Sequence, residues 1–455
     1  MRGDLEAGKP VFQDLISRYL LSNPHKVMLE MSPSEGFTAA KNESEGKFLS
    51  SLEKSLSEVD KKAIIDDLAA LKASQDAIQS LDQLPSLQLT DISPQVETVP
   101  YHSSRNVDSL QIRFISQPTN GLSYVRIRAD LSDLPVDLRE AVPLYVSFFN
   151  KMGTRSHSHA DFDNLKDLLT TGGVRCSLVV GSEKDSLAKY KEMLLFSVGF
   201  LNRNTAPAFS LLQEALTEVN FHEHAHSALL LQRSVKARTD DLLGNGVAFA
   251  SSLSAASLTP AASVYEALAC LRHDCRLAGE VLKEEEKMQS LAEKLDRIHR
   301  FAMNRDKMEV CVHSSDIGGI EEEFVRRFGV LSSGLLSAFA DYGKLRTGAL
   351  EVPFRRTALR SYFTLQGRVN FVVESFLGVP YTHPDYAVLS VLAELMTANF
   401  LHKEIREKGG AYGSGFQTDP QKGVITLFSY RDPRNLQTYD SFRLAMQQCS
   451  DGQFE

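Results

Sequence analysis

Several features that mark membrane, secreted or nucleophilic enzymes are missing from this sequence of 455 residues. It has no run of ~18 consecutive apolar residues, the length that a membrane-spanning helix needs. Its first dozen residues show neither a hydrophobic signal core nor an Arg-rich, acid-poor transit pattern. No G-x-S-x-G motif occurs, and no cysteine stands in a recognisable catalytic context. We therefore expect no membrane partner, no visible targeting segment and no serine or cysteine nucleophile.

Cysteine and basic charge are both limited. The five cysteines, at positions 176, 270, 275, 311 and 449, include no C-x-x-C pair and no zinc-ribbon spacing, which favours a reducing compartment. The 58 acidic residues outnumber the 50 basic ones and give a formal charge of −8. This balance argues against nucleic acid as the main partner and favours basic ligands. The content of 43% apolar and 24% charged residues is typical of a globular protein.

The first hundred residues resemble connecting structure. Residues 1–35, a helix broken at Asn23-Pro24 and then a short apolar strand, are expected to be the tail of a preceding α+β domain, so that the chain begins in mid-fold. Two amphipathic helical stretches that divide near Asp60 predict a helical hairpin linker over residues 36–95. The Pro, Ser and Thr content of residues 85–106 predicts a linker before the next domain.

An internal repeat organises the remaining sequence. The first copy contains a turn at Asn120-Gly121, helices at 138–152 and 162–170, Gly172-Gly173, strands at 174–180 and 193–200, and a helix that ends near Phe221. The second copy contains strands near Tyr362 and at 369–376, a helix that starts at Thr382-His383-Pro384-Asp385, Gly409-Gly410, strands at 411–416 and 424–430, and a helix that ends near Phe454. We therefore predict two related α+β domains, at residues 96–320 and 350–455, each a mostly antiparallel sheet with helices on one face.

The two copies differ in length. The first continues through three further apolar runs to a predicted closing strand at Met308 to His313, whereas the second has no counterpart. We therefore expect the second domain to be truncated and residues 350–455 to be the least stable region.

The stretch Phe400-Leu-His-Lys-Glu-Ile-Arg-Glu-Lys-Gly-Gly-Ala-Tyr-Gly413 resembles a signature in the fourth domain of the pitrilysin/insulinase family of zinc metallopeptidases, in the branch that degrades mitochondrial targeting peptides. Further matching segments are Val379 to Thr382, Pro384-Asp385, Leu395 to Thr397, Ser429 to Pro433, Gln117 to Gly121 and Leu258 to Ala261. The resemblance covers nearly the whole chain, more weakly in the hairpin linker.

The resemblance implies that this chain belongs to one half of a larger two-part enzyme. In this family four homologous α+β domains form two halves, joined by a helical hairpin, that close around a peptide. The zinc ion lies in the amino-terminal half, in a His-x-x-Glu-His motif that this chain lacks, because its one Glu-His pair is Glu223-His224 and position 220 is Asn. The chain would then hold the hairpin, the third domain and part of the fourth, with no catalytic or metal residue of its own, and would be inactive alone.

The implied partners are unfolded peptides, targeting peptides and the amino-terminal zinc-binding half, in the mitochondrial matrix, with neither nucleic acid nor membrane. Targeting peptides are basic, so an acidic chamber wall would hold them. The alternative is a non-catalytic partner or scaffold subunit of the same fold.

Two residues match the family's substrate-contacting positions in the carboxy-terminal half: Arg406 and Tyr412. A guanidinium and a phenol hydroxyl are suited to stabilise the negative charge that develops on a scissile carbonyl oxygen. The competing interpretation makes Arg406 a surface partner of Glu404 or Glu407 and Tyr412 an ordinary strand residue.

Histidine pairs offer the other candidate chemistry. His222 to His226 form an H-E-x-x-H pattern, which would suit an independent zinc enzyme. It has no nearby third ligand of the expected kind, and polar residues are common in a first helical turn, so we favour a structural role. His157-Ser158-His159 is interpreted as a solvated loop and Gly244-Asn245-Gly246 as a turn.

Overall fold

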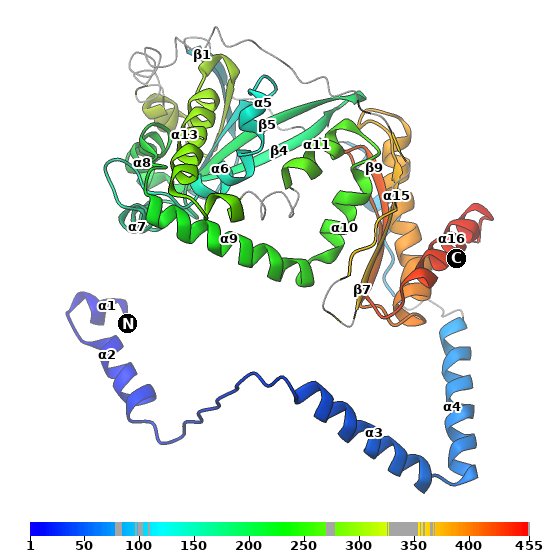
Figure 1. Ribbon diagram of the computed structural model, residues 1–455. Helices are drawn as coiled ribbons and strands as arrows, with labels where there is room; N and C mark the ends of the chain where they lie inside the picture. The colour runs from blue at the N-terminus through cyan, green and yellow to red at the C-terminus, as the bar shows by residue number, and fades with distance from the viewer. Residues whose placement is uncertain are drawn as a thin grey trace. The chain divides into compact units, whose positions relative to one another are not determined.

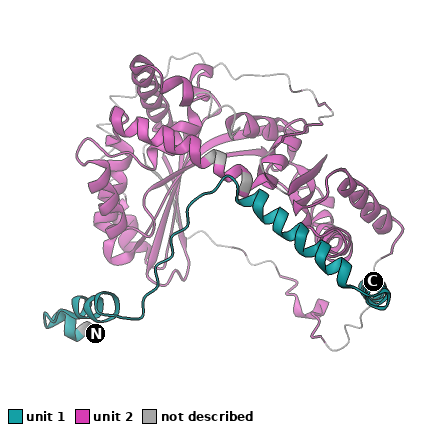
Figure 2. Cartoon of the chain, turned by 60° about the horizontal axis from the view of Figure 1, so that its bottom comes forward, with its two compact units in different colours: residues 1–81 teal, residues 82–455 magenta. Residues whose placement is uncertain are grey.

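The computed structural model describes residues 1–77, 84–95, 98, 103–107, 110–269, 278–324, 326, 354, 356–357, 360–364, 367 and 369–453. The chain divides into two compact units, residues 1–81 and 82–455 (Figure 2). Across the described ranges, no helix is both long enough and apolar enough to span a membrane.

The first unit is helical. Its elements are α1 (Arg2–Glu6), α2 (Val11–Ile16), the π-helical η1 (Ser17–Leu21), α3 (Phe37–Ser55) and α4 (Glu58–Asp76). The two predicted helical stretches are confirmed as α3 and α4, but they divide before Asp60. Asp60 instead belongs to a capping box, in which its backbone N–H donates to Ser57 Oγ at 3.2 Å and its carboxylate accepts from Ser57 N at 2.9 Å.

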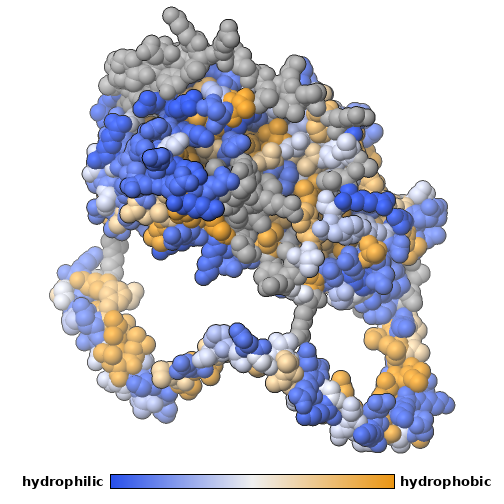
Figure 3. Space-filling view, viewed as in Figure 1, coloured by the Kyte–Doolittle hydropathy of each residue, from blue (hydrophilic) through white to orange (hydrophobic). Residues whose placement is uncertain are grey.

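The strand predicted after Asn23-Pro24 is wrong. Residues 25–34 form no strand, and the side chains of Val27 and Met28 are 97% and 94% exposed. A strand needs a hydrogen-bonded neighbour, and the described residues of this unit contain none. Large apolar side chains are exposed along much of the unit (Figure 3).

The first sheet of the second unit has six strands in the order β1-β2-β6-β3-β5-β4. They are β1 (Ser103–Val107), β2 (Leu110–Ser116), β3 (Leu122–Asp130), β4 (Arg175–Glu183), β5 (Ser186–Leu201) and β6 (Met308–Ser314). All neighbours are antiparallel except β2 and β6. The predicted closing strand, β6, thus exists but lies inside the sheet, between β2 and β3, so the turn at Asn120-Gly121 does not close a hairpin. β1 also occupies the end of the predicted linker.

Helices cover one face of this sheet (Figure 1). The helical elements are η2 (Leu89–Asp91), α5 (Val136–Arg139), α6 (Val142–Phe149), α7 (His159–Leu169), η3 (Asn202–Asn204), α8 (Thr205–Glu218), α9 (His224–Gly244), α10 (Gly246–Ala255), α11 (Pro260–Ala269), α13 (Glu285–Ala302) and η4 (Arg305–Lys307). Alternation along β3 fixes the orientation: Val125 and Ile127 are buried in the core with α6, α8 and α13, whereas Tyr124, Arg126 and Arg128 point to the opposite face and are exposed.

The second sheet has three antiparallel strands in the order β7-β9-β8. Its elements are β7 (Asn370–Leu377), α15 (Asp385–Met396), the π-helical η6 (Thr397–Glu407), β8 (Gly413–Asp419), β9 (Val424–Asp432) and α16 (Leu436–Ser450). The order of elements is as predicted, with one exception: Tyr362 lies in no strand and is 70% exposed. The α+β class with two sheets is confirmed, whereas the four domain boundaries stay predictions.

The two sheets contact each other within the second unit. Thr382, expected to start α15, instead donates from its backbone N and its Oγ1 to Lys184 O, at 2.9 and 3.0 Å. A second contact joins the segment before α11 to the turn between β8 and β9, where Thr259 Oγ1 donates to Lys422 O at 2.7 Å. Gly246 lies so close to the Phe371 ring that a Cβ would approach it to 2.3 Å. Gly246, at the predicted turn, therefore permits close packing of α10 on β7.

Candidate substrate-binding site

The two candidate residues flank the point where η6 ends and β8 begins. The helix forms because Phe400, Leu401 and Ile405 bury one face in the core of the small sheet. It ends at a glycine pair, and Gly410 has a φ of 77°, a left-handed conformation that glycine adopts without strain. The chain therefore reverses within a few residues and starts β8.

Backbone hydrogen bonds close the turn between the two candidate positions. Gly410 N donates to Arg406 O at 3.0 Å, and Ala411 N donates to Ile405 O at 3.1 Å. Arg406 and Tyr412 are both exposed, Tyr412 by 69%. The turn thus carries two exposed residues, Arg406 before it and Tyr412 after it.

The competing interpretation pairs Arg406 with Glu404 or Glu407, and the structure, which describes all three residues, shows neither ion pair. Glu404 accepts from Lys408 Nζ at 2.9 Å, which is an ordinary i,i+4 ion pair on a helix. Within the residues that the structure describes, no acid pairs with Arg406. The guanidinium is thus available to a ligand.

A β-bulge in β9 contacts Tyr412 through its backbone and through the ring of Tyr430. Asn370 pairs with Asp432 and Val372 pairs with Ser429, so two residues, Tyr430 and Arg431, oppose the single Phe371. Tyr412 N donates to Tyr430 O at 3.1 Å, and the two tyrosine rings lie edge to face at 5.8 Å between centroids. Tyr430 is itself fixed, because its hydroxyl donates to Gly244 O at 3.1 Å.

Arg431, the second residue of the bulge, has a φ of 51°, which a non-glycine residue seldom adopts. Sequence reasoning missed the bulge. The only available signal was the Asp432-Pro433 dipeptide, which is typical of a turn.

A buried carboxylate fixes the end of η6. Asp432 is completely buried and accepts from Thr438 Oγ1 at 2.7 Å and from Arg434 N at 2.8 Å. The Arg434 guanidinium donates in turn to Glu404 O at 3.4 Å, and a Cβ at Gly409 would approach that guanidinium to 2.1 Å. Arg434 therefore holds the last turn of the helix that carries Arg406, and sequence reasoning did not single it out.

The histidines of the H-E-x-x-H pattern do not converge. His222 Nε2 lies 2.8 Å from Asp296 Oδ2, whereas His226 Nε2 donates to Lys151 O at 3.0 Å. In the described part of the chain, no three His, Cys, Asp or Glu side chains are placed to share a metal ion. The described side chains of the H-E-x-x-H pattern therefore do not form a zinc site.

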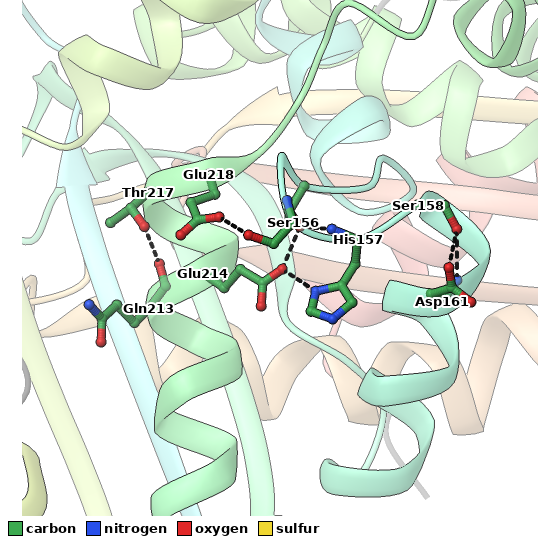
Figure 4. A network of polar contacts seen from close by, with 9 residues as sticks. Ser156, His157, Ser158, Asp161, Gln213, Glu214, Thr217 and Glu218 are labelled. Carbon is green, nitrogen blue, oxygen red and sulfur yellow. Dashed lines mark hydrogen bonds and ion pairs between the residues drawn. The ribbon is translucent and has the colours of Figure 1, made fainter.

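The loop predicted to be solvated at His157 to His159 is a structured contact (Figure 4). His157 Nδ1 lies 2.7 Å from Glu214 Oε1, and this carboxylate raises the pKa of His157. Ser158 caps α7 by accepting from Asp161 N at 3.2 Å, and the His159 ring stacks on the His226 ring at 3.7 Å. Residues 155–158 do form a loop, and the side chains of His157 and His159 are 39% and 40% exposed. What the sequence did not reveal is that the acidic end of α8 holds this loop through partners far away in sequence.

Comparisons with known proteins agree with this architecture. Residues 31–273, more than half of the chain, match the family model described as associated with subfamily C of peptidase M16, and residues 292–448 match the peptidase M16 inactive domain. The chain therefore belongs to the peptidase M16 family, and its carboxy-terminal part is the inactive kind of M16 domain.

The particular relatives are mitochondrial presequence proteases. The chain is 30% identical over 471 residues to the protein of that name from Xenopus laevis, covering 99% of this chain and 45% of the relative. It is 31% identical over 458 residues to the one from Danio rerio, covering 97% and 44%. The chain thus spans less than half the length of these relatives, and it is homologous to the region that carries their inactive domain.

One solved structure supports the fold alone. A conserved protein from Enterococcus faecalis aligns with a TM-score of 0.51 at 13% identity, covering 78% of this chain and 81% of that protein. The predicted resemblance to the metallopeptidase family is confirmed by these comparisons. The roles of Arg406 and Tyr412 stay predictions.

Proposed function

We propose that this chain is the substrate-binding, carboxy-terminal portion of a zinc metalloendopeptidase similar to presequence protease. It would work with an amino-terminal zinc-binding half on unfolded peptides, including targeting peptides, in the mitochondrial matrix. The observation that supports this most is that Arg406 and Tyr412 are both exposed, on either side of a turn at Gly409-Gly410 that backbone hydrogen bonds close.

In this proposal the chain's own residues bind and orient the substrate. The Tyr412 hydroxyl and the Arg406 guanidinium donate to the oxygen of the scissile carbonyl, where negative charge develops. The zinc ion of the other half, when bound, supplies a Lewis acid and an activated water. No residue of this chain is assigned to that ion, so the chain alone is expected to hydrolyse nothing.

A reconstituted activity tests the proposal. The chain is combined with the amino-terminal half of a presequence protease, and cleavage of a quenched peptide is followed with and without chelator. Tyr412→Phe should lower kcat by roughly 10²-fold, because one donor to the oxyanion is lost, and should change KM less. Tyr381→Phe, another exposed tyrosine (58%), is the matched control.

Three outcomes would contradict the proposal. An unchanged kcat, or an effect on KM alone, would remove Tyr412 from the oxyanion role. Chelator-sensitive cleavage by the chain alone would show that it carries its own metal site. Stable assembly of the two halves without any cleavage would favour a non-catalytic partner subunit.

A further inference from the structure

The face of the six-stranded sheet that is opposite the helices carries a row of arginines. The pairing register places Arg175 beside Ser197, Ser197 beside Arg126, Arg126 beside Cys311, and Cys311 beside Arg113. Neighbouring strands lie ≈ 4.8 Å apart, so Arg126 stands about 10 Å from Arg113 and about 10 Å from Arg175. Side chains as long as arginine reach across such distances.

The centre of this row has no acidic partner. Arg126 is exposed and pairs with no acid among the described residues. On either side, Arg113 Nη2 donates to Gln111 Oε1 at 3.1 Å and Arg175 Nε donates to Gly172 O at 2.7 Å. In the next row Arg128 pairs with Glu309. Arg126 is therefore the guanidinium of this face that is available to an anionic ligand.

Besides the larger effect of burial, the positive charge of these arginines acts to lower the pKa of two neighbouring side chains, Cys311 and His313. Arg113, Arg126 and Arg128 all act to lower the pKa of the Cys311 thiol against the larger effect of its burial, which raises it. Burial lowers the pKa of His313, and Arg126 lowers it further. Cys311 Sγ lies 3.3 Å from His313 Nε2, so a neutral thiol and imidazole form the floor beneath the guanidiniums.

We propose that this open sheet face binds acidic segments of extended peptides, with Arg126 at the centre of the contact. The inference rests on the proposed function and deepens it, because it names a class of substrate segment opposite to the basic one that the net charge of −8 favours. Guanidinium and carboxylate form charge-assisted, often bidentate hydrogen bonds.

The face is less suited to single-stranded nucleic acid. Sheets that bind single strands stack two or three bases on aromatic side chains. In the described residues of β2 to β6, the aromatic rings on this face include Tyr124 and its cross-strand neighbour His313. Tyr124 lies against Gly199, where a Cβ would be 3.1 Å from the ring. The row that holds Arg113, Arg126 and Arg175 contains no aromatic residue, so its centre suits the carboxylates of an extended peptide better than stacked bases.

Binding to a fluorescent peptide with glutamate at alternate positions tests the inference on the whole chain. Arg126→Gln should weaken binding by about threefold to fivefold, the size expected of one exposed charge pair, and Arg126→Glu should weaken it more. Arg126→Lys should retain most of the affinity. Arg443→Gln, which removes the charge of another exposed arginine, on α16, is the matched control and should have no effect.

A footprint gives a second readout. Bound acidic peptide should slow alkylation of Cys311 by iodoacetamide, whereas the glutamine version of the peptide should not. An affinity that is equal in Arg126→Gln and wild type, or tighter binding of a single-stranded oligonucleotide than of the acidic peptide, would overturn the inference.

The outcomes also separate the two proposals. If a basic targeting-type peptide binds through Arg406 and Tyr412 while the acidic peptide does not bind, the inference fails and the proposed function stands. If only the acidic peptide binds, and only through Arg126, the role proposed for Arg406 and Tyr412 fails, whereas acidic-peptide binding by the sheet face holds. If neither peptide binds, both fail.

Discussion

The two sheets of the second unit differ in how much they bury and in what they expose. Within the described residues, the core of the six-stranded sheet contains 46 buried apolar residues, against 11 in the core of the three-stranded sheet. Yet the smaller sheet carries Arg406 and Tyr412, exposed on a turn that Asp432 and Arg434 fix from behind. A small core is sufficient to fix the backbone of an exposed turn when a buried polar network sets the local geometry.

The largest expected effect comes from removing one ring from each core. Phe442, in the smaller core, and Phe196, in the larger, are both completely buried. Each Phe→Ala change should cost about 3–5 kcal/mol. In Phe442→Ala, amide protection should be lost in β9 (Val424–Asp432) and retained in β5 (Ser186–Leu201), because the smaller core has the lower free energy of local opening.

Hydrogen–deuterium exchange followed by mass spectrometry of peptides measures the difference in protection between β9 and β5. Phe196→Ala is the reciprocal variant. Simultaneous loss of protection in β9 and β5 would show that both sheets open as one cooperative unit. Equal protection of the two strands in the unmodified chain would contradict the expectation that residues 350–455 are the least stable.

A smaller effect is a pH dependence that His299 gives to the stability of the larger core. His299 Nε2 donates to Leu216 O at 3.0 Å and its Nδ1 accepts from Tyr145 Oη at 2.8 Å, so the imidazole is held neutral. Burial lowers the pKa of His299 to about 4. Between its ordinary pKa near 6.5 and that value, the unfolded chain binds more protons at this position than the folded chain.

The contribution of neutral His299 to the free energy of unfolding is therefore complete above pH ~6.5. It decreases as the pH drops towards 4, by about 3 kcal/mol in total. His299→Gln should flatten the decline in urea unfolding of the large sheet, whereas Tyr145→Phe, which keeps the imidazole, should leave the slope in place. An unchanged slope in His299→Gln would assign the decline to other groups.

Local sequence patterns predicted local structure well. The period of the apolar residues located α8, β5 and α15, and the glycine pairs marked the starts of β4 and β8. What the sequence could not reveal was pairing between distant segments. The insertion of β6 between β2 and β3 depends on which edge is free once the other strands have paired, and no local pattern records that.

The candidate site shows the same limit. Arg406 and Tyr412 were found because they lie within one continuous motif. Arg434 and Asp432 were missed because their role appears only when β9 and the following turn pack beneath η6. The contact of His157 was missed for a similar reason, since its partner Glu214 is 57 residues away.

The smallest expected effect tests the central claim most directly, which is that the rim of the small sheet grips peptide. The affinity of the chain for a basic, amphipathic targeting-type peptide is measured by fluorescence anisotropy for wild type, for the double variant Arg406→Gln/Tyr412→Phe, and for the control Tyr381→Phe. Because both side chains are exposed, the double variant should keep the melting temperature of wild type. It should bind about tenfold more weakly, since two hydrogen bonds of roughly 0.5–1.5 kcal/mol each are lost. Equal affinities in all three proteins would contradict the account.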